Sequence, residues 1–150
     1  MEYIGKIKNK ILNLSVAQKV GIVLLLLLFI VAGILYVNPK RKMVEMRNSQ
    51  RRSDVVNILN AVYEYSKKNG LPESINENPK MICRSGSSCE GFVDISGILE
   101  VEKKVLSEVP IDPSADDLST SGYQISKSAN GRINVMAPLA ENNAVIRLSK

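Results

Sequence analysis

An uninterrupted apolar segment near the amino terminus constrains this chain more than any other feature. Val20 to Val37 reads VGIVLLLLLFIVAGILYV, eighteen residues without a charge. As a helix this segment would extend about 27 Å, close to the thickness of the hydrocarbon core of a bilayer. A small domain could not surround such a helix with protein on every side, so a buried core helix is disfavoured. We therefore expect a transmembrane helix over residues 20–37, preceded by a basic segment over residues 1–19.

A cleaved signal peptide is the main alternative, because basic residues precede the apolar run. The run is longer than the usual apolar core of a signal peptide. Its small-residue triplet, Val31-Ala32-Gly33, lies inside the run rather than after it. Both features favour an anchor that is retained.

The charge of the chain is distributed on either side of this segment. The net charge of +5 at pH 7 separates into +3 over residues 1–19, +5 over residues 38–52 and −3 over residues 53–150. Because the basic excess flanks the apolar run and the remainder is acidic, no large basic surface remains, and we predict no nucleic-acid partner. The basic stretch over residues 40–52 is interpreted as a solvated helix face near the membrane.

The orientation of the anchor is argued from two opposing observations. Six Lys and Arg residues follow the segment closely and four precede it, a count that by itself would place the carboxyl-terminal side in the cytoplasm. A long translocated domain is largely indifferent to flanking charge, and both cysteines lie in that domain. Together with the family resemblance given below, this favours a cytoplasmic amino terminus and an extracytoplasmic carboxyl-terminal domain.

An amphipathic helix is expected over residues 38–70. Asn38-Pro39 is either the start of this helix or a kink in a helix that continues from the apolar run, and Gly70 suits the position just after the last turn. Residues 40–54 are nearly all polar and should make little core. Apolar residues then recur at three- and four-residue spacing, namely Val55, Ile58, Leu59, Val62, Tyr63 and Tyr65 or Ser66. We interpret the helix as a stalk whose far half packs onto a globular head of residues 71–150.

Two cysteines lie in a segment over residues 71–92 that is rich in Pro, Asn, Ser and Gly and is predicted to be a loop. Cys83 and Cys89 are separated by RSGSS, enough chain to bring the two sulfur atoms together. An extracytoplasmic location would keep the pair oxidised. We expect a structural disulfide, with two free thiols as the alternative.

The rest of the head is expected to form a short helix and a small antiparallel sheet. Residues 96–107 predict a helix with Leu99, Val101 and Val105 or Leu106 facing inward, ended by the prolines at 110 and 113. Strands are expected over residues 123–127, 132–137 and 144–148, with Asn130-Gly131 as a tight hairpin turn. The predicted fold class is α+β, a long amino-terminal helix packed on a small antiparallel sheet.

Composition excludes several kinds of chemistry. The chain has no histidine, which removes Ser-His and Cys-His catalysis, and it contains neither phosphate-binding glycine motif, G-x-x-x-x-G-K-[ST] or G-x-G-x-x-G. We expect no enzyme activity, no cofactor and no small-molecule substrate. Asp112, Asp116 and Asp117 could offer carboxylates to calcium, but the ligand ladder of a calcium loop is missing, and such loops are usually solvated turns. Calcium is therefore a minor alternative.

A family resemblance rests on several segments. These are Asn38-Pro39, RNSQRRSDVVNILNAVYEYSKKNG over residues 47–70 and, in the head, ICRSGSSC, VPIDP and GYQISKSANGRINVMAP. In this order they resemble type IV pilins and the pseudopilins of type II secretion. The resemblance covers residues 38–150 and implies a pilin-like fold, in which the amino-terminal helix associates with the membrane and with similar subunits.

The amino terminus departs from the pattern of that family. Counting back from Asn38-Pro39, the processing glycine would fall at about Asn13 and the family's glutamate at about Gln18, and neither matches. That glutamate neutralises the terminal amine of a buried neighbour, which an uncharged glutamine cannot do. We therefore expect an uncleaved, membrane-anchored pilin-like protein whose polymerisation into a fibre is in doubt.

Three functions follow from these observations. The leading one is a structural or assembly subunit of a type IV pilus-like or type II secretion-like apparatus. The second is a membrane-tethered extracytoplasmic module that binds a partner and never polymerises. An enzyme comes third, because no catalytic cluster is visible.

Overall fold

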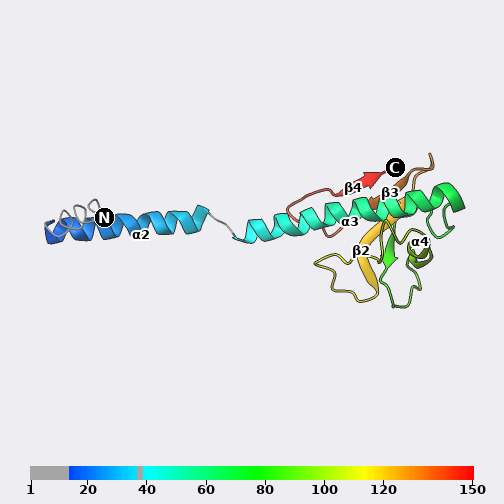
Figure 1. Cartoon of the computed structure of the whole chain (residues 1–150), viewed down its shortest axis with the longest axis horizontal. Helices are drawn as coiled ribbons and strands as arrows, with labels where there is room; N and C mark the ends of the chain where they lie inside the picture. The colour runs from blue at the N-terminus through cyan, green and yellow to red at the C-terminus, as the bar shows by residue number, and fades with distance from the viewer. Residues whose placement is uncertain (1–13, 37–38) are drawn as a thin grey trace. The chain divides into compact units, whose positions relative to one another are not determined.

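The computed structural model describes residues 14–36 and 39–150. The chain divides into two compact units, one reaching to Lys42 and the other running from Met43 to Lys150. The first unit contains helix α2, Val16–Tyr36, and the first turn of helix α3 (Figure 1). The second unit contains the rest of α3 and the head, and each unit is described by itself.

Helix α2 covers nearly all of the predicted membrane segment and begins earlier than expected. Its start is closed by a capping box, in which the backbone N–H of Ser15 donates to the Gln18 side chain at 3.0 Å and the backbone N–H of Gln18 donates to the Ser15 hydroxyl at 3.3 Å. Every α2 side chain that the structure describes is exposed. The helix is long and apolar enough to cross a membrane. Val37 lies outside the described residues.

Helix α3, Pro39–Asn69, is the predicted stalk helix. It ends as expected at Gly70, whose φ of 76° is left-handed and whose N–H donates to the carbonyl of Ser66 at 3.0 Å. Val55, Ile58, Leu59 and Val62 of the predicted stripe are buried, and Tyr63 and Tyr65 pack against the same core. Asn38 lies outside the described residues.

The head is built on a four-stranded antiparallel sheet in the order β1-β2-β3-β4. The strands are β1, Lys80–Cys83; β2, Thr120–Lys127; β3, Ile133–Met136; and β4, Arg147–Ser149. The prediction of loop throughout residues 71–92 is wrong at β1. This four-residue strand is created by pairing with β2, about forty residues later, and such pairing leaves little local signal.

The loop of the hairpin between β2 and β3 is longer than the tight turn predicted from the sequence. The N–H of Ser128 donates to the carbonyl of Arg132 at 2.8 Å, which closes a loop wider than a two-residue turn. Gly131 has the expected positive φ, 84°, whereas Asn130 does not. Strand β4 also begins later than the predicted residue 144, after a turn in which Asn142 and Asn143 both have a φ of 55°.

Helix α4, Ser96–Val101, is half the length predicted for residues 96–107. Ile98 and Leu99 are buried, and the inward position expected for Val101 is wrong, since that side chain is exposed. Of the two alternatives Val105 and Leu106, it is Leu106 that packs against the core. The chain leaves the helix at Glu102, which is itself buried and accepts a hydrogen bond from the Lys68 ammonium at 2.9 Å. The helix therefore ends well before Pro110.

One hydrophobic core joins α3 to the sheet. Figure 1 shows α3 lying along one face of the strands, and the core combines side chains of α3, β1, β2, β3 and α4. Cys83 and Cys89 form the expected disulfide, with their Cα atoms 5.3 Å apart. The α+β class and the small antiparallel sheet are therefore as predicted.

Candidate functional site

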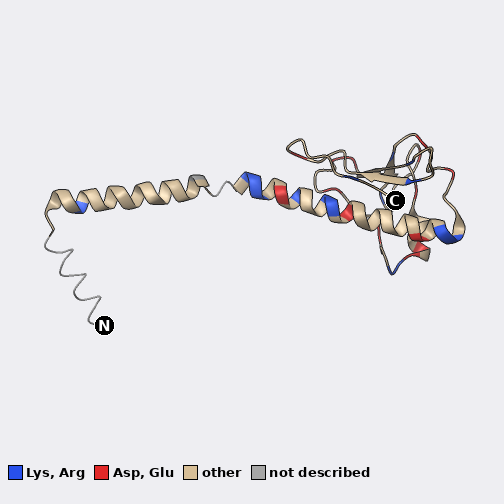
Figure 2. Cartoon of the chain, turned by 90° about the horizontal axis from the view of Figure 1, so that it is seen from above, with Lys and Arg blue, Asp and Glu red and all other residues tan. Residues whose placement is uncertain are grey.

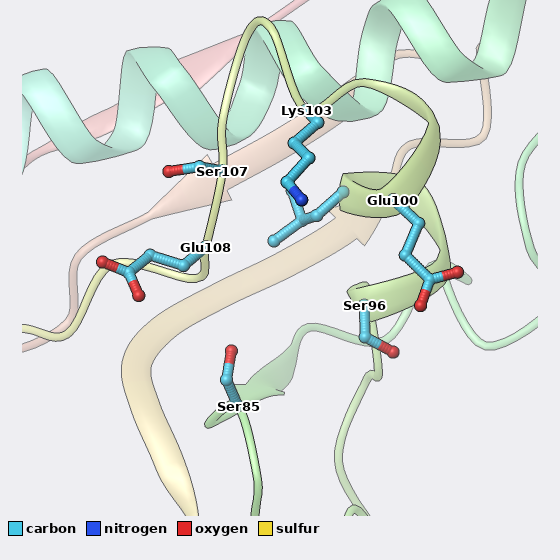
Figure 3. Close-up of a pocket in the computed structure, with 7 residues that line it drawn as sticks. Ser85, Ser96, Glu100, Lys103, Ser107 and Glu108 are labelled. Atoms are coloured by element: carbon cyan, nitrogen blue, oxygen red, sulfur yellow. The ribbon is translucent and has the colours of Figure 1, made fainter.

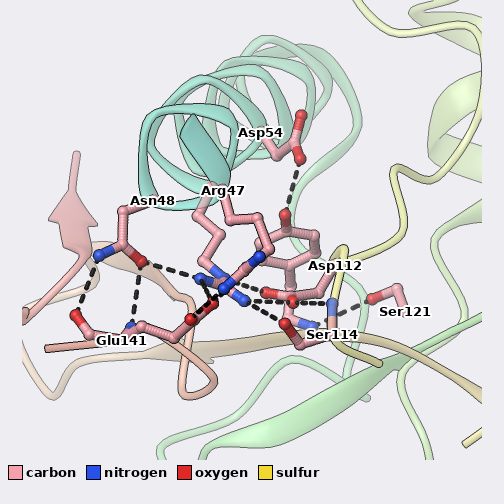
Figure 4. Close-up of polar contacts among 9 residues, drawn as sticks. Arg47, Asn48, Asp54, Asp112, Ser114, Ser121 and Glu141 are labelled. Carbon is pink, nitrogen blue, oxygen red and sulfur yellow. Dashed lines mark hydrogen bonds and ion pairs between the residues drawn. The ribbon is translucent and has the colours of Figure 1, made fainter. Parts of the chain in front are cut away.

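Polar residues on the first half of α3 form a buried cluster that the sequence analysis missed. Arg47, Asn48 and Arg51 lie within one turn of each other and bond to loops of the head. Figure 4 shows Arg47 and Asn48 on the side of Glu141. Asn48 is 5% exposed and Arg51 is completely buried. The interpretation of residues 40–52 as a solvated face is therefore wrong at these positions. We call Arg47, Asn48, Arg51, Asp112, Ser114 and Glu141 the arginine clasp.

Arg51 is the centre of the arginine clasp, because all five of its N–H donors have acceptors. Its Nε and Nη2 grip both carboxylate oxygens of Asp112, at 2.7 and 2.9 Å. Nη2 also donates to the Ser114 hydroxyl at 2.8 Å. Nη1 donates to Asn48 Oδ1 at 2.8 Å and to Glu141 Oε1 at 3.0 Å. The hydrogen bond with Asp112 raises the pKa of Arg51 against the opposing effect of burial.

Asp112 is held in place from its own loop as well. Its carboxylate accepts the N–H of Ser114 at 2.8 Å, and its own N–H donates to the carbonyl of Ser121 at 2.8 Å. The backbone at Asp112 lies very close to the backbone at Gly122, which leaves no room for a side chain at position 122. A Cβ on Gly122 would stand 2.6 Å from the Asp112 Cβ, and the φ of Gly122 is +85°, so glycine is required there on both counts.

Glu141 is bound to α3 by both its side chain and its backbone. Arg47 donates to the Glu141 carboxylate through two nitrogens, with Nε at 2.6 Å. The Asn48 side chain bonds twice to the backbone of Glu141, with its Nδ2 donating to the Glu141 carbonyl at 2.9 Å and its Oδ1 accepting the Glu141 N–H at 3.1 Å. The hydrogen bonds from Arg47, and after them the one from Arg51, lower the pKa of Glu141 to about 2.

A second polar contact lies one turn further along α3. The hydroxyl of the fully buried Tyr123 donates to the Asp54 carboxylate at 2.6 Å. Burial raises the pKa of Tyr123, and the hydrogen bond to Asp54 adds to that effect. Burial also raises the pKa of Asp54, although the Tyr123 hydroxyl opposes this. This contact joins α3 to the middle strand β2.

The arrangement holds groups in place and leaves them little capacity to react. Two guanidiniums face two carboxylates, so the charges of the arginine clasp balance, and within the described residues no buried side-chain nitrogen or oxygen lacks a hydrogen-bond partner. A general base or nucleophile needs a lone pair free for substrate. The absence of enzyme activity stays a prediction.

A signal in the sequence could have revealed Asn48 and Arg51. The apolar stripe Val55, Ile58 and Val62 continues backwards at three- and four-residue steps onto Arg51 and Asn48. Both residues therefore lie on the core face of the helix. The loop partners Asp112 and Glu141 carry no comparable signal, because they are about sixty and ninety residues away.

The structure does not bring the three candidate calcium ligands together. Asp112 is buried on Arg51, whereas Asp116 and Asp117 are exposed. The prediction of a solvated turn is therefore wrong for Asp112. Among the residues described, no group of three or more His, Cys, Asp or Glu could hold a metal ion. The expected absence of a metal cofactor stays a prediction, with calcium as its minor alternative.

The two positions that depart from the pilin processing pattern have different outcomes. Gln18 lies in the capping box of α2, where its amide oxygen accepts the N–H of Ser15. Its observed role is thus to start a helix. Asn13 lies outside the described residues.

A shallow depression of about 370 Å³ lies beside α4. Figure 3 shows Glu100 and Glu108 on opposite sides of it, with Lys103 between them and serines around. Charges of both signs on exposed side chains define no particular ligand. We assign it no function.

The largest exposed feature is the apolar surface of α2. Figure 2 shows this helix almost without charged residues beyond its first turn, whereas α3 carries charges of both signs. Among its side chains, Leu28 is 71% exposed and Phe29 68%. A soluble surface does not normally present so large an apolar area, so α2 needs a partner or a membrane.

Comparison with known proteins adds no identification. No protein-family model, no curated protein and no solved structure matches this chain. The functional argument therefore rests on the residues and on their arrangement.

Removing the Arg51 guanidinium should destabilise the head strongly. Arg51→Leu leaves Asp112 buried without its partner, and we expect the free energy of unfolding to fall by about 3 to 5 kcal/mol. The matched control is Arg52→Leu at the adjacent exposed position, with an expected change within about 0.5 kcal/mol. Urea unfolding of the detergent-solubilised chain, followed by tyrosine fluorescence, measures both. Equal losses in the two variants would contradict a central role for Arg51.

The contribution of Glu141 to the stability of the head should be lost in acid. The pKa of Glu141 is about 2 in the folded chain and about 4.3 when unfolded, so its ionised form stabilises the fold above the unfolded value. That contribution is lost as the pH falls from about 4.3 towards 2. The difference in unfolding midpoint between the wild type and Glu141→Gln should therefore shrink over this range. If the difference in unfolding midpoint between the wild type and Glu141→Gln does not change with pH, the Glu141 carboxylate does not stabilise the head in its ionised form.

Proposed function

We propose that this protein is a membrane-anchored structural or assembly subunit of a type IV pilus-like or type II secretion-like apparatus. The exposed apolar surface of α2 carries the proposal. The helix has 21 residues, enough to cross the hydrocarbon core of a bilayer. Such a surface is covered either by lipid or by similar helices packed against it.

The class of the fold is compatible with this proposal. A long helix packed on a small antiparallel sheet is the arrangement implied by the resemblance of residues 38–150 to pilins and pseudopilins. The arginine clasp ties the first half of α3 to two loops of the head. A subunit anchored by α2 would need a firm connection of this kind to bear load on the head.

The proposed orientation places the amino terminus in the cytoplasm and the head outside. The disulfide Cys83–Cys89 supports it, because such bonds persist in oxidising compartments. We further propose that the leader is retained. The support is the sequence itself, in which Asn13 and Gln18 stand where the family has its processing glycine and its glutamate.

Cysteines placed along α2 should cross-link neighbouring copies. Each of the positions 24 to 30 is changed to cysteine in turn in the full chain, whose own cysteines are paired. After mild oxidation in membranes, we expect covalent dimers at positions three or four residues apart, since one face of a helix repeats at that spacing. A cysteine at exposed Ser107 is the control. Monomer at every α2 position would favour the alternative, a membrane-tethered binding module that does not polymerise.

Intact-mass measurement tests whether the leader is retained. The protein extracted from membranes should have the mass of the full chain apart from the initiator methionine. Loss of about 13 residues, which corresponds to cleavage near Asn13, would overturn the uncleaved state. The chain expressed without a prepilin peptidase gives the reference mass.

A further inference from the structure

An apolar groove lies between α3 and the edge strand β4. It encloses about 350 Å³ and is lined by Arg52 and Val56 of α3 and by residues 145–148. Its apolar residues remain open to solvent, with Val56 40%, Leu148 42% and Val145 90% exposed. Arg52 and Arg147 add two exposed positive charges. Within the described part of the chain, neither guanidinium takes part in an ion pair.

Strand β4 also leaves one hydrogen-bonding edge free in the described part of the chain. Ile133 and Lys150 exchange both of their backbone hydrogen bonds, at 2.9 and 3.0 Å. In an antiparallel pair the direction alternates, so the peptide groups of Ser149 and Arg147 point away from β3. Such an edge can accept an extended segment from another chain.

A loop elsewhere on the head has the complementary chemistry. Asp116 and Asp117 are exposed, and Leu118 next to them is 73% exposed. The loop is shaped by the Asp117 carboxylate, which accepts the N–H of Ser119 at 2.7 Å. Two carboxylates beside a projecting leucine match two guanidiniums beside an apolar groove.

The groove and the loop lie at the same level of α3 but on different sides of it. Arg51 bonds to Ser114 at the start of this loop, whereas Arg52, the next residue and so about 100° further round the helix, lines the groove. In Figure 1 the loop before β2 and strand β4 appear on opposite sides of α3. One head therefore cannot fill its own groove, but a second copy beside it can.

We propose that the head of one copy inserts Leu118, flanked by Asp116 and Asp117, into the groove of the next copy at Arg52 and Arg147. The contact joins two different surfaces, so it repeats from copy to copy in a head-to-tail row. Because both surfaces lie at one level of α3, two heads whose α3 helices run parallel can form the contact side by side. The inference rests on the proposed assembly function and names the head surfaces that the assembly would use.

Cross-linking in membranes tests whether this contact pairs two unlike surfaces, as a head-to-tail arrangement requires. Leu118→Cys is made in one tagged full-length chain and Leu148→Cys in another. Co-expression of the two should give a covalent heterodimer, whereas each variant alone should give about tenfold less dimer, because a head-to-tail contact pairs unlike surfaces. A chain that carries both cysteines should give a ladder of higher multiples. Ser107→Cys, paired with Leu148→Cys, is the control for random collision.

Charge reversal tests the chemistry. Arg52→Glu with Arg147→Glu should reduce the heterodimer about tenfold, and Asp116→Lys with Asp117→Lys in the other chain should restore it. Arg132→Glu, an exposed charge at the β2–β3 turn, should change nothing.

Three outcomes would overturn the inference: no heterodimer, dimers of Leu148→Cys with itself, or reversal without rescue. Cross-linking through α2 is scored in parallel. Dimers through α2 without dimers through the head would reject this contact and leave the proposed function standing, whereas loss of both would reject the function as well.

Discussion

The hydrogen bonds of the buried Arg51 guanidinium are the interaction on which the rest of the head depends. A charge removed from water is costly unless every donor finds an acceptor, and here five donors meet five acceptor contacts. Those acceptors come from α3 itself and from two loops far apart in the chain. Once Arg51 is buried, Asp112 and Glu141 must lie within hydrogen-bonding distance of its guanidinium.

This requirement has consequences beyond the arginine clasp. Asp112 can reach Arg51 only because Gly122 has no Cβ. The ion pair therefore requires glycine at the start of β2, although no residue of β2 takes part in it. The clasp also extends the contact of α3 with the head from the apolar stripe at Val55 back to Arg47. The loop that carries Asp116 and Asp117 begins at the same ion pair, which holds the start of this loop at the level of Arg51 on α3.

Much of the fold could be predicted from local pattern. The apolar run, the stripe from Val55, the Gly70 end of α3 and the disulfide are encoded in neighbouring residues. The failures have two causes. Strand β1 depends on β2, a partner distant in the chain. Arg51 was misjudged because a charged residue is usually exposed, although its place in the stripe marked it as facing the core.

The sequence alone determined that the chain has a membrane-length apolar helix followed by an amphipathic one, because helix period and hydrophobicity are local properties. It also determined that histidine chemistry is absent. Only the tertiary structure decided which charges are buried, since burial depends on which loops meet α3. It also decided that Asp112 serves an arginine, and that an acidic loop and a basic groove lie on different sides of one helix. These are relations between distant residues, and no local pattern contains them.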